Sequence, residues 1–269
     1  MTLDPGFISF AKGLKYFIYL YLLKPLNVFL TQIPWWYTMT VFIIIGYVTV
    51  GLRFATITAI LLAFIGATGM WMHSMITLSS VLVSVLICFV IGVPLGVLAS
   101  YNKWYRDIQN VVLDAMQTLP YFCYLIPVLM FFGGNIVSAV IATVIYSVPP
   151  IIRLTALGLS QVSSGYSEVS KSFGGTGIQT LNKVKFPLAV PSLVMGFNQT
   201  VIMAFAMQIV TPLIGGKGLG LQVFNALQRS DTGRGLSAGL AIVLLAIIID
   251  RITHAWTKKQ RQALGLDQS

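Results

Sequence analysis

The sequence predicts an all-α integral membrane protein with about seven transmembrane helices. Hydrophobic residues make up 57% of the 269 residues and charged residues only 9%, whereas soluble domains carry about 25% charge. Long runs without charge recur along the chain, and about 20 apolar residues suffice to cross a ~30 Å hydrocarbon core. Helices are expected for these runs because an open sheet in lipid would leave backbone groups unpaired.

The expected spans follow the apolar runs in chain order. They lie near residues 35–52, 54–71, 76–100, 118–132, 136–153, 188–213 and 236–256. The run from Ala115 to Ile152 is long enough for two passes, with a turn at Gly133-Gly134-Asn135. Before the first span, an amphipathic helix from about Gly6 to Leu23, ended by Lys24-Pro25, is predicted to lie flat on a membrane face.

The net charge of +10 is distributed unevenly between the loops. Three regions that fall on the same side of the predicted topology hold most of the basic residues: Lys103 and Arg106; Arg153, Lys171, Lys183 and Lys185; Arg251, Lys258, Lys259 and Arg261. The positive-inside rule makes this side cytoplasmic and argues against a nucleic-acid partner. The side of the N-terminus stays open, because Lys12, Lys15 and Lys24 prefer the inside whereas the span count puts them outside.

Residues for catalysis or for metal binding are not gathered anywhere in the sequence. Cys88 and Cys123 fall in predicted spans, and His73 and His254 lie near opposite span ends. The seven acidic residues are scattered, and neither glycine-rich segment, 174–177 or 215–220, has the lysine and hydroxyl of a phosphate loop. We therefore expect no enzyme activity, no metal and no cofactor in this chain, and any energy must come from a partner.

A polar stretch from Leu154 to Lys185 separates two long apolar runs and holds the chain's one glutamate, Glu168. Val169-Ser170 follow Glu168, Gly174 comes after three further residues, and Val184-Lys185-Phe186-Pro187 comes after nine more. Such a segment is too polar for lipid. The pattern predicts a short helix presented to another protein, with glycine allowing a close approach and Pro187 beginning the next span.

This spacing resembles the cytoplasmic docking loop by which the membrane subunit of an ABC importer contacts its ATPase. The family pattern is E-A-A, three residues, G, nine residues, I, one residue, L-P; here Val169 and Ser170 stand for the alanines and Phe186 for the leucine. The resemblance implies that the ATPase-coupling residues are Glu168, Val169, Ser170, Gly174, Gly175, Val184 and Pro187. A solvated loop without a partner is the alternative.

Further stretches resemble permeases of the proline/glycine-betaine branch of the binding-protein-dependent transport system inner membrane component family. They are residues 114–121, 124–127, 148–155, 183–191, 198–200, 218–220 and 245–253. The resemblance implies a type I importer transmembrane fold and a homodimer of permeases with two ATPase subunits. ATP and Mg would lie on those ATPases. An external substrate-binding protein would deliver an osmoprotectant at the bacterial inner membrane, and the C-terminus would be cytoplasmic.

The implied organisation has four parts. Residues 1–34 would be interfacial, 35–72 accessory helices, 73–257 the permease core with its coupling loop at 154–186, and 258–269 a cytoplasmic tail. Alternating access, driven by ATP on the partner, is the expected mechanism. The other class left open is an ion-coupled secondary transporter or channel, although the spans offer few mid-membrane charges for it.

Candidate residues for the substrate pathway come from polar positions inside spans. They are Asp114, Gln117, Thr118, Tyr121, Tyr124, Asn198, Gln199 and Met203. The first four recur at i, i+3, i+4 and i+7, which predicts one face of one helix. Hydrogen bonding between helices, or ordinary core packing for Met203, is the alternative at each position. Aromatic faces such as Tyr121, Phe122 and Tyr124 are candidates for attracting a quaternary ammonium group.

Overall fold

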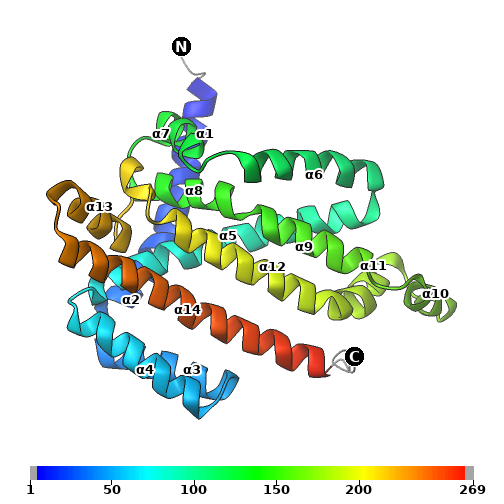
Figure 1. The fold of residues 1–269 in the computed structure, drawn as a ribbon. Helices are drawn as coiled ribbons and strands as arrows, with labels where there is room; N and C mark the ends of the chain where they lie inside the picture. The colour runs from blue at the N-terminus through cyan, green and yellow to red at the C-terminus, as the bar shows by residue number, and fades with distance from the viewer. Residues whose placement is uncertain (1–4, 264–269) are drawn as a thin grey trace. The chain divides into compact units, whose positions relative to one another are not determined.

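A computed structural model describes residues 5–263, and every regular element in that range is helical (Figure 1). In chain order the elements are α1 (Pro5–Phe17), η1 (Ile18–Leu23), α2 (Lys24–Gln32), α3 (Trp35–Thr49), α4 (Leu52–Ala67), α5 (Trp71–Tyr101), α6 (Lys103–Thr118), α7 (Phe122–Phe132), α8 (Ile136–Ser147), α9 (Pro149–Ser160), α10 (Ser164–Ser172), α11 (Gly177–Thr180), η2 (Leu181–Lys185), α12 (Phe186–Met207), η3 (Thr211–Ile214), α13 (Leu219–Arg229) and α14 (Thr232–Ala263). Of the predicted tail at 258–269, residues 264–269 lie outside the described range.

The helices confirm a multi-pass membrane protein. Within the described range, four helical stretches are long and apolar enough to span a bilayer: Trp71–Tyr101, Ile136–Ser160, Gly177–Met207 and Thr232–Ala255. Two bent helix pairs pass the same test, Ser9–Gln32 with Trp35–Thr49 and Lys103–Thr118 with Phe122–Phe132. The shorter apolar helix Leu52–Ala67 completes the set.

The N-terminal helix does not end at Lys24-Pro25, so that prediction is wrong. The π-helical segment η1 leads directly into α2, and the backbone N–H of Lys24 donates to Tyr19 O. Pro25 lies in the first turn of α2, where a missing N–H is tolerated. The chain turns only at Ile33, which is extended before Pro34, and the pair bends by 103°.

The predicted span at 118–132 is also corrected. The amphipathic helix α6 begins at Lys103 and ends at Thr118, and α7 begins at Phe122 after a bend of 99°. Pro120 lies in the break, where it removes a backbone donor and disfavours helix at the residue before it. Apolar composition alone does not reveal this change of direction.

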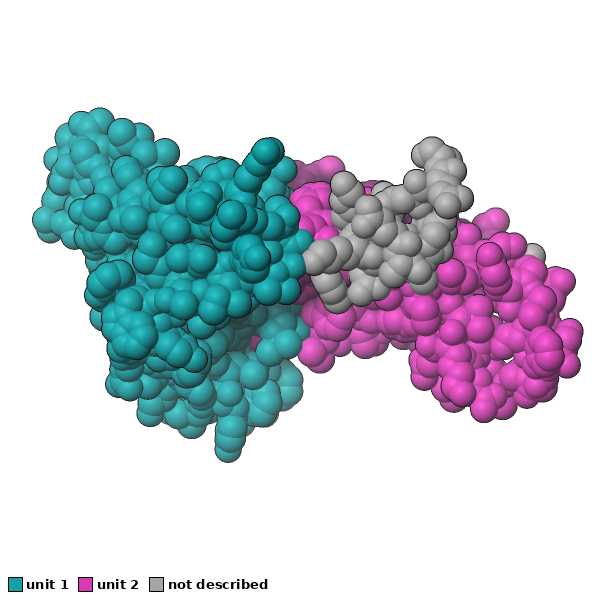
Figure 2. Space-filling model, turned by 90° about the horizontal axis from the view of Figure 1, so that it is seen from below, with its two compact units in different colours: residues 1–86, 119–147, 201–252 teal, residues 87–118, 148–200, 253–269 magenta. Residues whose placement is uncertain are grey.

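The described chain divides into two compact units, shown in different colours in Figure 2. Unit 1 contains residues 1–86, 119–147 and 201–252, and unit 2 contains 87–118, 148–200 and 253–269. Each unit has its own apolar core. Leu125, Val128, Ala142, Met207 and Ile214 pack together in unit 1, and Leu159, Ala189 and Leu193 pack together in unit 2.

Close helix packing in unit 2 depends on glycine. A Cβ at Gly96 of α5 would lie 2.7 Å from the carbonyl oxygen of Ile152 on α9, and one at Gly158 would lie 2.6 Å from Cβ of Ser192 on α12. Both distances are shorter than a side chain tolerates. Glycine therefore allows α9 to pack closely against both α5 and α12.

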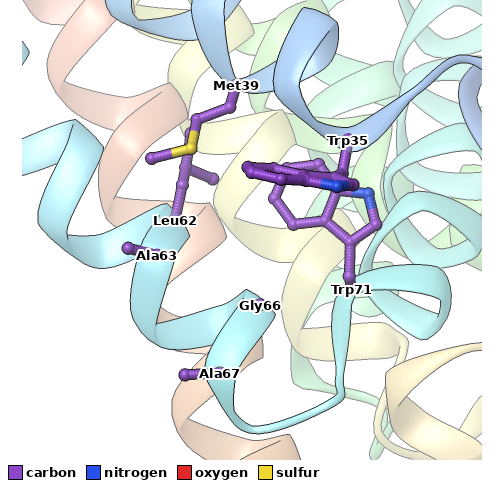
Figure 3. A pocket seen from close by; sticks show the side chains of 7 residues that line it. All are labelled: Trp35, Met39, Leu62, Ala63, Gly66, Ala67 and Trp71. Carbon is purple, nitrogen blue, oxygen red and sulfur yellow. The ribbon is translucent and has the colours of Figure 1, made fainter.

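In unit 1, α3 and α4 form a hairpin that turns at Gly51, where φ is +123°. Trp35, Met39, Leu62, Ala63, Gly66, Ala67 and Trp71 line an apolar hollow of about 500 Å³ against it (Figure 3). Large apolar side chains such as Ile44 and Ile60 point outward from the hairpin. This is the arrangement expected of helices that face lipid.

Candidate functional site

The predicted docking loop folds as a small helical hairpin in unit 2. After α9 ends at Ser160, α10 carries Glu168, Val169 and Ser170, and the chain returns through α11 and η2 into α12. The two helices are held together by a hydrogen bond of 2.8 Å between the hydroxyl groups of Ser170 and Thr180. The helix expected at Glu168 is therefore present, and we call residues 164–185 the coupling hairpin.

Gly174 ends α10 by its backbone conformation. Its φ is +78°, and the N–H of Gly175 donates to the carbonyl oxygen of Ser170 at 2.9 Å, which closes the last turn in a Schellman arrangement. A Cβ on Gly174 would meet nothing within 4 Å inside the chain. The left-handed conformation, which costs an L side chain roughly 1–2 kcal/mol, explains the glycine here.

Glycine is required at position 175 for a different reason. A Cβ there would lie 2.6 Å from Oγ of Ser170 and 2.7 Å from its carbonyl oxygen, so only glycine lets the turn close against α10. Thr176 then begins α11 with a capping box, since its side chain accepts from the N–H of Gln179 and the Gln179 side chain accepts from the N–H of Thr176. Both ends of the turn are thereby satisfied within the chain.

The outer surface of the coupling hairpin carries exposed apolar side chains. Phe173 is 89% exposed and Ile178 is 75% exposed, and Tyr166 and Val169 also point outward. A hollow of about 590 Å³ lies beside them, lined by Tyr166, Val169, Ser170, Phe173, Gly174, Gly175, Gln179, Lys183 and Val184. Exposed apolar groups gathered around a hollow are typical of a protein contact surface.

The structure gathers five of the seven predicted coupling residues around this hollow: Val169, Ser170, Gly174, Gly175 and Val184. Glu168 lies on α10 with an exposed side chain, outside the lining, and Pro187 lies in the first turn of α12. At the base of the hairpin, the Lys185 ammonium lies 5.2 Å from the centre of the Tyr101 ring at the end of α5. This contact joins η2, the returning arm of the hairpin, to α5.

The first group of pathway candidates is divided by the bend after α6. Asp114, Gln117 and Thr118 lie on α6, but Tyr121 lies beyond its end, so the expected single face does not include Tyr121. Tyr121 lies beside Phe122, with ring centres 5.0 Å apart, and both side chains are about half exposed. Tyr124 is buried, with its ring 6.1 Å from that of Tyr146, and therefore contributes to packing.

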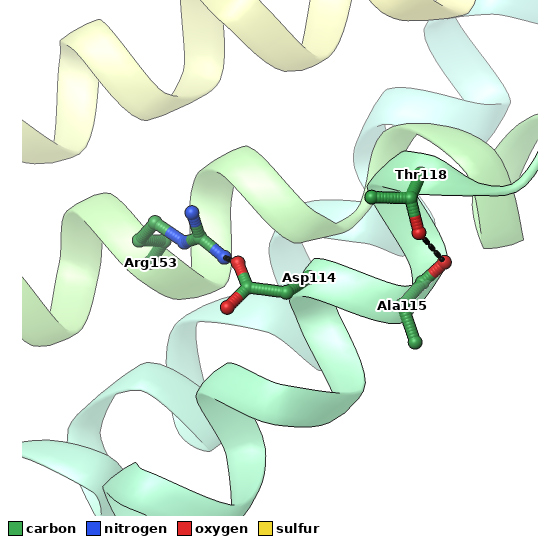
Figure 4. Close-up of polar contacts among 4 residues, drawn as sticks. All are labelled: Asp114, Ala115, Thr118 and Arg153. Carbon is green, nitrogen blue, oxygen red and sulfur yellow. Dashed lines mark hydrogen bonds and ion pairs between the residues drawn. The ribbon is translucent and has the colours of Figure 1, made fainter.

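Asp114 forms an ion pair that the sequence did not predict. Nη2 of Arg153 on α9 donates to Oδ1 of Asp114 at 2.6 Å, and the two side chains point toward one another in Figure 4. Thr118 turns back to its own helix, where its hydroxyl donates to the carbonyl oxygen of Ala115. The only signal in the sequence was a lone acidic and a lone basic residue, each at the polar end of an apolar run. A pair this exposed contributes about 0.2–1 kcal/mol.

The second group of pathway candidates lies on α12. Asn198 is buried, Gln199 is exposed and Met203 is half-buried. Met207, one turn beyond Met203, is a core residue of unit 1. Of these three candidates, Gln199 is the one whose side chain is open at the surface of the single chain.

The second glycine-rich segment, 215–220, packs inside unit 1. Thr77 of α5 accepts a hydrogen bond of 2.8 Å from the N–H of Leu219 and so caps the start of α13. A Cβ on Gly220 would clash with the carbonyl oxygen of Gln208. The glycines here serve close packing.

On α13, the Gln222 side chain accepts from Nε of Arg234 at 3.0 Å and lies 3.3 Å from Nδ1 of His73.

The chain combines a multi-pass helical fold with a helical hairpin that carries exposed apolar side chains. The model of the family described as "Binding-protein-dependent transport system inner membrane component" matches residues 92–262. The chain belongs to this family. Its fold is similar to that of the MetNI methionine ABC transporter in an inward-facing conformation, with a TM-score of 0.61 and 24% identity over 68% of this chain and 92% of that one.

Two curated relatives have similar sequences. The glycine betaine/proline betaine transport system permease protein ProW of Escherichia coli is 40% identical over 241 residues, which cover 90% of this chain and 68% of the relative. The glycine betaine/carnitine transport permease protein GbuB of Listeria monocytogenes is 45% identical over 191 residues, 71% of this chain and 68% of the relative. The chain thus matches about two thirds of each relative's length. The resemblance inferred from the sequence is confirmed.

Proposed function

We propose that this chain is the translocation subunit of an ATP-driven importer for glycine betaine and related quaternary ammonium solutes, such as proline betaine, carnitine and choline. The observation that carries the proposal is the coupling hairpin, a preformed helical projection with exposed apolar residues, in a chain of this family. The substrate class is supported by the permeases to which the chain is similar.

The coupling hairpin would be the contact with the ATPase. Two permease copies would pair with two ATPase subunits, and these would bind ATP and Mg. Phe173 and Val169 would enter a groove on the ATPase, and Glu168 would lie at the edge of the contact, where a charge costs little to keep hydrated. Closure of the ATPase pair would then displace α10.

Movement of α10 would reach the spans through covalent and packed contacts in unit 2. The Ser170–Thr180 hydrogen bond joins α10 to α11, and η2 continues into α12. Alternating access follows if the nucleotide-bound and nucleotide-free partners favour different arrangements of these helices. An external binding protein with its solute would shift the equilibrium between the two arrangements only if it bound one of them more tightly than the other.

The test is uptake of radiolabelled glycine betaine into proteoliposomes that contain the permease together with a candidate ATPase subunit and a candidate external binding protein from the same organism. We expect uptake to require all three proteins and ATP. Removal of residues 165–177 should abolish uptake while membrane insertion is kept. Uptake by the permease alone, driven by a sodium or proton gradient, would instead identify a secondary transporter and contradict the proposal.

A further inference from the structure

A polar hollow of about 460 Å³ lies between α6 and α9 in unit 2. Its lining consists of Arg106, Asn110, Asp114, Arg153, Ala156, Leu157 and Ser160. The volume lies in the range of roughly 300–1,000 Å³ that small-molecule sites occupy. The Asp114–Arg153 ion pair of Figure 4 forms part of the wall.

Each helix contributes one polar stripe to the hollow. Arg106, Asn110 and Asp114 are spaced four residues apart on α6, and Arg153 and Ser160 are two turns apart on α9. Residues at these spacings lie on one side of a helix. Trp104 and Val111 of α6 are exposed outside the lining. The part of α6 that faces the hollow is therefore the stripe of Arg106, Asn110 and Asp114.

We propose that this hollow is a transit site for a zwitterionic quaternary ammonium solute, in which Arg153 and Arg106 hold the carboxylate and Asp114 faces the ammonium group. The inference rests on the proposed function, because it places the solute of that function at a site in this chain. It extends the pathway beyond Asp114 to four residues, Arg106, Asn110, Arg153 and Ser160, that the sequence did not indicate as pathway candidates.

The charges fit a zwitterion better than a simple ion. Two guanidinium groups and one carboxylate line the hollow, so a lone cation meets repulsion from the arginines and a lone anion competes with Asp114. No aromatic ring is among the described residues of the lining, so Asp114 is the group that can attract the ammonium. In Arg153, Nε is buried and has no hydrogen-bond acceptor among the described residues, so the pair with Asp114 leaves one donor of this guanidinium group unsatisfied.

Opening the site is energetically easy. The Asp114 and Arg153 side chains are 64% and 39% exposed, so their ion pair is weakened by solvent. A zwitterion replaces this one pair with two, its carboxylate with Arg153 and its ammonium with Asp114. Binding should stay weak, roughly millimolar, as a transit site requires, because a solute that binds tightly would not leave.

Direct binding tests the inference. The permease–ATPase complex in lipid nanodiscs, without nucleotide and without the binding protein, is titrated with glycine betaine, and saturation-transfer NMR follows the methyl protons. We expect saturable binding at millimolar concentration. Choline, which lacks the carboxylate, should bind at least about tenfold more weakly, and acetate should compete poorly. Arg153→Gln, Asp114→Asn and Arg106→Gln should each weaken glycine betaine binding severalfold or more.

Asp107→Asn is the matched control, because Asp107 is an exposed carboxylate of α6 that is not part of the lining. It should bind like the wild type. Arg106→Gln leaves the ion pair intact, so it tests the site even if a change in the pair prevents folding. Equal binding of choline and glycine betaine, or unchanged binding in the Arg153 and Arg106 variants, would overturn the inference.

The inference and the proposed function fail in different ways. Normal ATP-driven uptake by a wild-type complex that shows no such binding overturns the transit site alone. Absence of ATP-driven uptake with every partner present overturns the proposed function. Loss of uptake in Arg153→Gln with unchanged binding would mean that the ion pair acts in the structure only, which also contradicts the transit site.

Discussion

Two glycine-rich turns of this protein look alike in sequence and differ in the fold. In the coupling hairpin, a Cβ on Gly174 or Gly177 would meet nothing within 4 Å. In segment 215–220, a Cβ on Gly216 or Gly218 would lie less than 3.0 Å from Thr211 or Thr77. In the first turn Gly174 and Gly177 are open and only Gly175 packs on its own chain, against Ser170, whereas the second turn is occupied by its own chain. Glycine clusters therefore need a packing test before they indicate a binding site.

The largest effect should come from a larger side chain in segment 215–220, which we call the closed turn; the turn at residues 174–177 of the coupling hairpin is called the open turn. Gly220→Val places branched atoms against the carbonyl oxygen of Gln208, and overpacking of this kind costs about 1–3 kcal/mol or more. We expect little folded protein in detergent extracts, measured by size-exclusion chromatography. Gly239→Ala in α14, where a Cβ meets nothing within 4 Å, is the control and should fold normally.

The next largest effect is expected from a change in the coupling hairpin that lowers uptake without affecting folding. Phe173→Asp puts a charge on the most exposed apolar side chain of the hairpin. If Phe173 is a central contact of the ATPase interface, its loss costs 2 kcal/mol or more, so uptake and ATPase association should fall at least about 30-fold. The unfolding temperature should not change. Phe173→Leu keeps an apolar contact and should retain most uptake; full uptake by Phe173→Asp would remove the contrast between the turns.

A smaller effect is expected from the cap of the closed turn. Thr77→Val removes the acceptor for the N–H of Leu219 and leaves a buried donor unpaired, which costs about 1–3 kcal/mol. The thermal unfolding temperature of the purified permease should fall. Thr77→Ser keeps the hydroxyl group and should remain near the wild type. An unchanged temperature in Thr77→Val would show that α13 does not depend on this bond.

The smallest effect should come from the hydrogen bond inside the open hairpin. Ser170→Ala removes the bond to Thr180, worth about 0.5–1.5 kcal/mol, and should loosen α10 against α11. Uptake should fall a fewfold, with faster hydrogen exchange confined to residues 164–180. Ser172→Ala is the control, because the Ser172 hydroxyl donates to the carbonyl oxygen of Glu168 in its own helix, and this variant should behave as the wild type. Equal loss in both variants would contradict a coupling role for the bond.

The sequence predicted what depends on composition and on local spacing. Apolar runs located the spans because lipid admits few other solutions, and the spacing from Glu168 to Pro187 located the hairpin and its helix. The reason for each glycine was only partly predicted. A close approach was expected at Gly174 and Gly175; at Gly174 the backbone conformation is what the fold shows, and at Gly175 the close neighbour is Ser170.

What the sequence could not predict are relations between distant residues and changes of helix direction. Arg153 and Asp114 are 39 positions apart, and nothing local pairs them. The predicted span at 118–132 began at the end of α6, because hydropathy does not show that the chain bends by 99° between α6 and α7. At Pro25 the local rule predicted a stop, but a π-helical turn before it let the helix continue.

The internal closure of the hairpin has a thermodynamic consequence. The Schellman turn at Gly174 and the capping box at Thr176 satisfy the backbone from within, so the contact surface exists before any partner arrives. In the proposed function, docking of the ATPase would require no disorder-to-order transition and would spend little binding free energy on conformational entropy. A modest interface would then suffice for attachment.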